Sequence, residues 1–147
     1  MDVRENNFFL INISRNIYFL ENDLPLLEKF VNQDYVIQID AGSIIGHFGK
    51  QVQDCANKII LNGLFHLIGS DAHNDKKRNF CLGNLFKIQN AVINNYKKLI
   101  FNHNPQKIID GDSISAVKEY FDDDKFTLWR GILHKFTGKF LRRIYKK

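Results

Sequence analysis

Apolar runs alternate with amphipathic stretches along this 147-residue chain, and this alternation constrains the fold more than any other feature. Apolar residues recur every three or four positions in the amphipathic stretches, which is the period of a helix, whereas the run at 35–39 is β-branched, as in strands. We expect strands over 8–13, 35–39 and 64–68, and helices over 20–32, 50–61, 82–101 and 104–110. Because the links are short, the strands should form a parallel sheet with flanking helices, an α/β fold.

Polar residues occur where each of these strands should end. Asn12, Asp40 and Asp71 fall near the three carboxyl ends, where parallel sheets bind their ligands. His73 follows Asp71 by two positions, so a carboxylate and an imidazole should face one opening, a donor pair suited to a divalent metal. The alternative is a strand-end turn in which Asp71 caps the next segment and His73 packs locally. We expect Asp40 to form a turn out of the second strand, over residues 40–43.

The positive charge is concentrated at the C-terminal end. The formal net charge is +5, yet no acidic residue follows Asp124, so the body of the chain does not resemble a nucleic-acid-binding protein. Residues 126–147 place an apolar stripe on one side of an expected helix, with Lys and Arg on its flanks. Such a helix can lie on an anionic membrane or dock on a partner, or it can pack on the body with its basic face solvated. We expect a body over 1–112 and a basic amphipathic extension over 113–147. The stripe consists of Trp129, Leu133, Phe136, Phe140 and Ile144.

The two cysteines restrict the chemistry and the compartment. Cys55 and Cys81 do not have the spacing of a zinc site, which favours free thiols in a reducing cytoplasm. Neither has an arginine six residues further on, which excludes cysteine-based tyrosine phosphatase chemistry. The first twenty residues lack the apolar run of a signal peptide, and no segment approaches the roughly 18–20 apolar residues of a membrane helix. We therefore expect a cytoplasmic protein, with the inner face of the membrane as a second location through residues 126–147.

Three stretches of the chain follow a known pattern. They are Ile37-Gln38-Ile39-Asp40-Ala41-Gly42-Ser43 followed by Gly46 and Phe48-Gly49-Lys50, then Gly63-Leu64 through Ser70-Asp71-Ala72-His73-Asn74 with Arg78, then Asn104-Pro105 with Ile108-Ile109 and Gly111. Over about residues 8–112 the chain thereby resembles the C-terminal half of bacterial PHP-type (polymerase and histidinol phosphatase) protein-tyrosine phosphatases. These are metal-dependent enzymes of capsule and exopolysaccharide loci.

The resemblance implies part of a (β/α) barrel of distorted TIM type, with manganese-like ions at the strand ends. Asp71 and His73 then correspond to a closing pair of metal ligands, and Arg78 to an arginine that grips the phosphate. Arg15, in Ile13-Ser14-Arg15-Asn16, matches a second phosphate-binding arginine. The implied activity is hydrolysis of phosphotyrosine on a bacterial tyrosine kinase that controls polysaccharide synthesis, without a covalent phosphoenzyme.

The chain also departs from the family pattern. Asn12 stands in place of a ligand histidine, and Asp40 stands where asparagine is common. The family's His-x-His motif and glutamate ligands lie in an N-terminal half that has no counterpart here, so Asp71 and His73 should hold metal weakly. We therefore expect a truncated phosphatase that needs a partner half or a second copy. The alternative is a non-catalytic remnant that binds a partner half or the membrane, and a nucleic-acid binder acting through the basic tail is a weaker third hypothesis.

Overall fold

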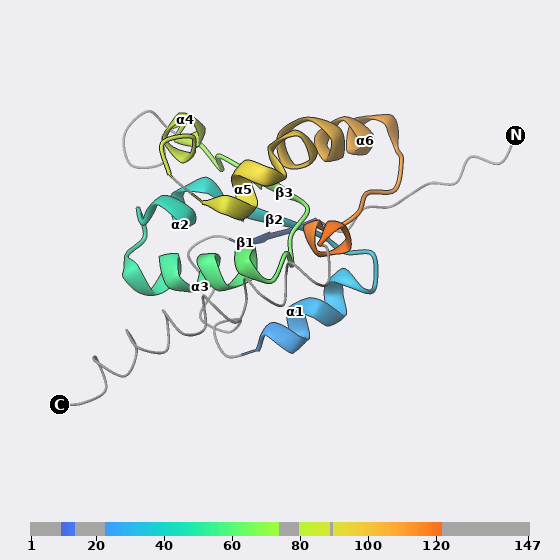
Figure 1. Cartoon of the computed structure of the whole chain (residues 1–147), viewed down its shortest axis with the longest axis horizontal. Coiled ribbons are helices and arrows are strands. Elements are labelled where there is room, and N and C mark those ends of the chain that lie inside the picture. The colour runs from blue at the N-terminus through green and yellow to red at the C-terminus, as the bar shows by residue number, and fades with distance from the viewer. Residues whose placement is uncertain (1–9, 14–22, 74–79, 89, 122–147) are drawn as a thin grey trace, which may run out of the picture.

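The core of the fold is a three-stranded parallel sheet (Figure 1). The computed structural model describes residues 10–13, 23–73, 80–88 and 90–121. Strands β1 (Leu10–Ile13), β2 (Val36–Asp40) and β3 (Leu67–Gly69) lie in the order β1-β2-β3. Both neighbouring pairs run parallel, with Ile11 opposite Ile37 and Ile39 opposite Ile68. The predicted α/β architecture is confirmed.

The two faces of the sheet differ because side chains alternate along a strand. Ile37, Ile39 and Ile68 are buried and belong to the hydrophobic core. Helices α1 (Leu24–Val31) and α3 (Lys50–Leu61) lie along one side of the strands in Figure 1 and contribute buried apolar residues to this core. The alternate positions of β1 and β2 are polar at Asn12 and Gln38, which are not buried. One face therefore packs this core, while the other carries the amides of Asn12 and Gln38 next to the buried Val36 and Asp40.

Helix boundaries follow local capping chemistry where the sequence signals are strong. The Asp23 carboxylate accepts a hydrogen bond from the Leu26 N–H (3.0 Å) and begins α1, as expected of an N-cap. Helix α3 ends at Asn62, and Gly63 follows with a φ of 64°. Helix α6 (Asn104–Asp110) ends at Gly111, whose φ is 78°. The predicted helices over 50–61 and 104–110 are confirmed.

The single helix predicted over 82–101 is wrong. The structure has α4 (Leu82–Leu85), α5 (Ala91–Asn95) and a π-helix, η2 (Leu99–His103). The Asn90 side chain accepts a hydrogen bond from the Ile93 N–H (3.1 Å), which begins a new helix at that point. Asparagine side chains compete with the helical backbone for hydrogen bonds, and residues 84, 90, 94 and 95 are all asparagine. The apolar period correctly indicated helical structure in this region, but it could not show where one helix ends and the next begins.

The strand predicted over 64–68 begins later, at Leu67, because His66 replaces part of the expected ladder. The Ile37 N–H donates to Nδ1 of His66 (3.0 Å), while the His66 N–H donates to the Ile37 carbonyl (2.9 Å). The carbonyls of preceding residues accept hydrogen bonds from the segment that contains the 3-10 helix η3 (Val117–Tyr120). The Val117 N–H donates to the Phe65 carbonyl and the Lys118 N–H to the Gly63 carbonyl. Residues 63–66 are thus fixed between β2 and η3.

The turn predicted over 40–43 is instead a short helix, α2 (Ala41–Ile45), which ends at Gly46 with a φ of 86°. Asp40 begins this helix as its N-cap, so the tight change of direction is made by a helical turn. Among the residues described, no helix is both long enough and apolar enough to cross a membrane.

The start of the predicted C-terminal extension packs on the body. Ala116 and Val117 are fully buried and belong to the core. Residues 122–147, with the stripe from Trp129 to Ile144, lie outside the described part of the chain. The boundary after residue 112 and the amphipathic helix remain predictions.

Candidate functional site

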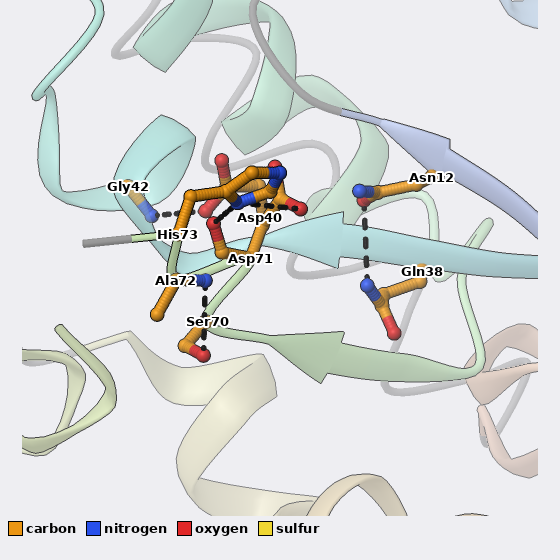
Figure 2. A network of polar contacts seen from close by, with 8 residues as sticks. All are labelled: Asn12, Gln38, Asp40, Gly42, Ser70, Asp71, Ala72 and His73. Atoms are coloured by element: carbon orange, nitrogen blue, oxygen red, sulfur yellow. Dashed lines mark hydrogen bonds and ion pairs between the residues drawn. The ribbon is translucent and has the colours of Figure 1, made fainter. Parts of the chain in front are cut away.

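Three polar residues lie together at the carboxyl ends of β2 and β3 (Figure 2). Asp40 is the last residue of β2, and it lies opposite Gly69, the last residue of β3. Asp71 and His73 follow two and four residues after Gly69. The parallel pairing of the strands therefore brings residues from two parts of the sequence to one edge of the sheet, as the sequence predicted.

Asp40 acts first as a structural cap. Its side chain is buried, with 1% of its surface exposed, and its Oδ1 accepts a hydrogen bond from the Gly42 N–H (2.8 Å). Asp40 therefore caps a helix instead of forming the predicted turn. Space at Gly42 is tight, because an added Cβ would lie 3.0 Å from the Phe48 ring and 3.3 Å from Asp40 Oδ1.

Neither cysteine is suited to act as a nucleophile. Cys55 and Cys81 are buried, and neither forms a disulfide within the described residues, in agreement with the predicted thiols. Burial raises the pKa of the Cys81 thiol, and the nearby Asp40 carboxylate raises it further. Because the reactive species of a cysteine is its thiolate, this environment keeps Cys81 protonated and unreactive.

Asp71 and His73 form a locally organised pair. Nδ1 of His73 lies 2.8 Å from the Asp71 carbonyl oxygen and 3.8 Å from Asp71 Oδ1. A carbonyl can only accept, so Nδ1 is the donor in this hydrogen bond, and the neutral ring with this tautomer has its lone pair on Nε2. Asp71 has a φ of 47°, a left-handed conformation that aspartate tolerates better than most residues. The backbone thus directs its carbonyl at the imidazole.

The exposure of this pair suits ligand binding. The His73 side chain is 55% exposed and the Asp71 side chain is 16% exposed. Histidine ligands of metals usually donate their second ring N–H to a carbonyl or carboxylate, which fixes the ring. His73 already has this arrangement. The ligand role and the alternative of a locally packed strand-end turn both remain predictions.

Gln38 is a feature that the sequence analysis missed. Its Nε2 donates to Asn12 Oδ1 across the β1–β2 pair (3.4 Å), as Figure 2 shows. A Cβ added to Gly69 would lie 2.7 Å from the Gln38 carboxamide, so the amide rests directly on the β3 backbone. The signal was present: Val36, Gln38 and Asp40 alternate onto one face of β2.

The other predicted site residues lie outside the described part of the chain. Arg15 falls within residues 14–22 and Arg78 within 74–79, so their phosphate-binding roles remain predictions. Among the residues that the structure describes, no group of three or more His, Cys, Asp and Glu is placed to hold a metal ion. Asp71 and His73 fit a divalent metal chemically, as one oxygen and one nitrogen donor, but they supply only part of a ligand set.

The sequence matches a known protein family. Residues 13–110 match the family described as capsular polysaccharide synthesis, CpsB/CapC. The chain belongs to the CpsB/CapC family. The match includes both strand ends and the Asp71–His73 pair, and it confirms the resemblance to capsule-locus phosphatases inferred from the sequence.

Named relatives of this CpsB/CapC chain are tyrosine phosphatases. It is 39% identical over 72 residues to a putative tyrosine-protein phosphatase CapC of Staphylococcus aureus, across 49% of this chain and 28% of that protein. It is 41% identical over 66 residues to the tyrosine-protein phosphatase YwqE of Bacillus subtilis, across 45% of this chain and 26% of YwqE. The chain thus matches about a quarter of the length of these curated relatives.

A solved structure supports the same relationship. The fold resembles a chain from the crystal structures of YwqE from Bacillus subtilis and CpsB from Streptococcus pneumoniae, which are described as unique metal-dependent tyrosine phosphatases. The TM-score is 0.58 at 29% sequence identity, across 74% of this chain and 44% of that chain. The sheet and its flanking helices are therefore the architecture of this family, matched over less than half of the solved chain.

Proposed function

We propose that this chain provides part of the active site of a metal-dependent phosphotyrosine phosphatase. The observation that supports this most is the orientation of the His73 imidazole. Its Nδ1–H donates a hydrogen bond to the Asp71 carbonyl, so Nε2 of the exposed ring can act as a metal ligand. The Asp71 carboxylate lies beside it and supplies an oxygen. These two residues would hold one divalent cation, of which manganese is our specific proposal.

The residues around the pair would orient and bind rather than react. A divalent cation at such a site lowers the pKa of bound water and neutralises phosphoryl oxygens. Asp40 keeps the start of α2 in place through its bond to Gly42. Arg78 and Arg15 are proposed to bind the phosphate, because a planar guanidinium can contact two phosphate oxygens at once.

The biological setting is also a proposal. The family description and the named relatives suggest a tyrosine-phosphorylated protein of capsule synthesis as the substrate, and we propose a bacterial tyrosine kinase in particular. We further propose that the sheet is part of a PHP-type barrel, that the protein is cytoplasmic, and that residues 126–147 contact the membrane surface or a partner.

The direct test is turnover by the full chain supplied with Mn²⁺ and a phosphotyrosine peptide. We expect phosphate release that stops on chelation and falls at least a hundredfold in Asp71→Ala. Asp54→Ala, at an exposed carboxylate on α3, is the matched control and should leave turnover unchanged. Turnover that persists with chelator, or that Asp71→Ala leaves intact, would contradict a metal-dependent site at this pair.

A second candidate function is a non-catalytic binding module. It is favoured by one observation, that the described residues supply two metal donors rather than a group of three. In that case the full chain would bind a phosphotyrosine peptide without hydrolysing it, even with Mn²⁺ and a folded far-ultraviolet spectrum. Recovery of turnover on mixing with a separate chain carrying the missing ligands would instead favour a phosphatase completed by a partner.

A further inference from the structure

Two exposed aromatic residues flank helix α4. Phe80 is 74% exposed and Phe86 is 50% exposed, while Leu85 between them is buried and anchors the helix. Soluble proteins expose single apolar side chains commonly, but exposed aromatic residues that lie close together are characteristic of binding surfaces. Phe80 precedes this four-residue helix and Phe86 follows it, so the two rings flank one short element.

This surface adjoins the candidate site. Helix α4 contacts α2, the helix that Asp40 caps. Cys81, the N-cap of α4, is close enough to Asp40 for that carboxylate to raise its pKa, after the larger effect of burial. Figure 1 shows α4 and α2 at the same end of the molecule, the end at which β2 leads into α2. A peptide bound at the strand ends could therefore extend across α4.

Phe86 is held in a fixed orientation by its neighbours. Its ring meets Phe101 of η2 edge to face, with 5.4 Å between ring centroids. The Lys97 Nζ lies 4.2 Å from the centre of the Phe86 ring, within the range of a cation–π interaction. An aromatic ring that is half exposed yet fixed in this way loses little conformational freedom when it binds a partner.

Between residues 80 and 109 of the sequence, the Lys, Arg, Asp and Glu positions are all lysines. Residues 80–109 contain no Asp or Glu, but they contain Lys87, Lys97, Lys98 and Lys107. Lys87 follows Phe86 directly and is exposed, as is Lys97. We refer to Phe80, Phe86, Lys87 and Lys97 as the α4 surface. Its partner should be anionic and should have aromatic or apolar groups of its own.

We propose that the α4 surface binds an acidic peptide segment with aromatic side chains, next to the residue presented to the candidate site. The link to that site rests on the proposed phosphatase function. Ring stacking on Phe80 and Phe86 would provide contact area, and the lysines would select acidic flanking residues. A lipid surface fits less well, because recognition of anionic membranes generally uses clusters of about four to eight basic residues, whereas the α4 surface has two.

The test is binding of the full chain to a fluorescein-labelled, unphosphorylated peptide of alternating tyrosine and glutamate, measured by anisotropy. We expect saturable binding that weakens as salt is raised. The double variant Phe80→Ser with Lys87→Glu should weaken it on the order of tenfold. Both side chains are exposed, so this variant should fold normally, as circular dichroism can verify.

A matched control is available on α6. Ile109 is 78% exposed and Lys107 is exposed, and Figure 1 shows α6 at the opposite end of the molecule from α4. The double variant Ile109→Ser with Lys107→Glu makes the same charge reversal and also replaces an exposed apolar side chain by serine, and it should leave binding unchanged.

Several outcomes would overturn the proposal. They are the absence of peptide binding, equal weakening by the α4 and α6 variants, and equal binding of a peptide with lysine in place of glutamate. Binding of phosphatidylglycerol vesicles through the α4 surface without binding of the peptide would identify a lipid surface instead. The probe has no phosphate, so the two tests are independent. Failure of peptide binding would not contradict the proposed hydrolysis, and absence of hydrolysis would not contradict peptide binding.

Discussion

Two histidines that lie seven residues apart are used in opposite ways. His66 is 3% exposed, and its Nδ1 accepts the Ile37 N–H. The His73 side chain is 55% exposed, and its Nδ1 donates to the Asp71 carbonyl. The first ring therefore carries its proton on Nε2 and the second carries it on Nδ1. The backbone group at Nδ1 thus sets which nitrogen carries the proton in each ring.

The same contrast extends to the surroundings of each histidine. Around His66 the polar groups are paired within the protein: Asn104 Nδ2 donates to the His66 carbonyl (2.7 Å) and to the Ser115 carbonyl (3.0 Å). Around His73 the chain is exposed and includes Asp71 in a left-handed conformation. Strained, incompletely buried backbone of this kind is common at functional sites. The segment before β3 is therefore bound within the fold, whereas His73 after β3 keeps more than half of its side chain exposed.

The largest expected loss of stability comes from adding a side chain at Gly63, in the segment that leads to His66. A Cβ at Gly63 would lie 2.6 Å from the Lys118 backbone nitrogen and from the Phe121 ring, and Gly63 has a φ of 64°. Overpacking and backbone strain together should make Gly63→Ala about 3–4 kcal/mol less stable in urea unfolding. Gly111→Ala is the control: its φ is 78° but nothing lies within 4 Å, so the loss should be about 1 kcal/mol. Equal losses would show that η3 is not held closely against residue 63.

The pH dependence of stability should reveal the burial of His66. Burial lowers the pKa of His66 from 6.5 to about 4, although the Glu119 and Asp34 carboxylates oppose this shift. Between these values the unfolded chain binds more protons than the folded protein, so stability rises with pH. The contribution is complete above pH 6.5 and should be lost as the pH falls to 4, at a cost of about 3 kcal/mol.

The variant His66→Asn isolates this effect from that of other groups. Its side-chain oxygen can accept the Ile37 N–H, but it does not titrate. Urea unfolding of both proteins across this pH range should give a shallower slope for the variant. Identical slopes would mean that His66 does not control the acid sensitivity.

A smaller effect is expected from Asn104. Asn104→Ala leaves the carbonyls of His66 and Ser115 without their donor, at a cost of about 2 kcal/mol for two neutral hydrogen bonds. Asn102→Ala, at an exposed position of η2, should change stability by less than about 0.5 kcal/mol. If both variants unfold at the same urea concentration, Asn104 does not hold the region before β3 in place.

The smallest effect on stability is expected at the ligand pair. Asparagine also tolerates the left-handed conformation at position 71, so Asp71→Asn should change stability by less than about 0.5 kcal/mol. Loss of the anionic ligand should nevertheless weaken Mn²⁺ binding at least about tenfold, measured by calorimetry. Unchanged affinity for Mn²⁺ would remove Asp71 from the site.

The elements with strong local signals were predictable from the sequence, and those that depend on distant contacts were not. Helix α3 was found because its apolar period and its Asn62-Gly63 stop agree. The breaks in 82–101 were missed because they depend on individual asparagine side chains. The late start of β3 was missed because it depends on distant contacts. His66 bonds to β2, and the N–H groups of residues 117–118, some 50 positions away, donate to the carbonyls of Phe65 and Gly63.

The candidate site was predictable to a similar extent. Strand ends and donor types indicated Asp71 and His73, and the family resemblance placed them in a phosphatase. The tautomer of His73 and the carboxamide of Gln38 lying against Gly69 depend on three-dimensional geometry, which residue spacing does not specify.

The most direct test of the account is the state of the two imidazoles, measured by long-range ¹H–¹⁵N NMR of the full chain with Zn²⁺ as a diamagnetic probe. The account predicts a proton on Nδ1 of His73 and on Nε2 of His66, with Zn²⁺ shifting Nε2 of His73 and leaving His66 unchanged. A His73 ring that carries its proton on Nε2 and does not respond to Zn²⁺ would contradict the assignment of this pair as metal ligands.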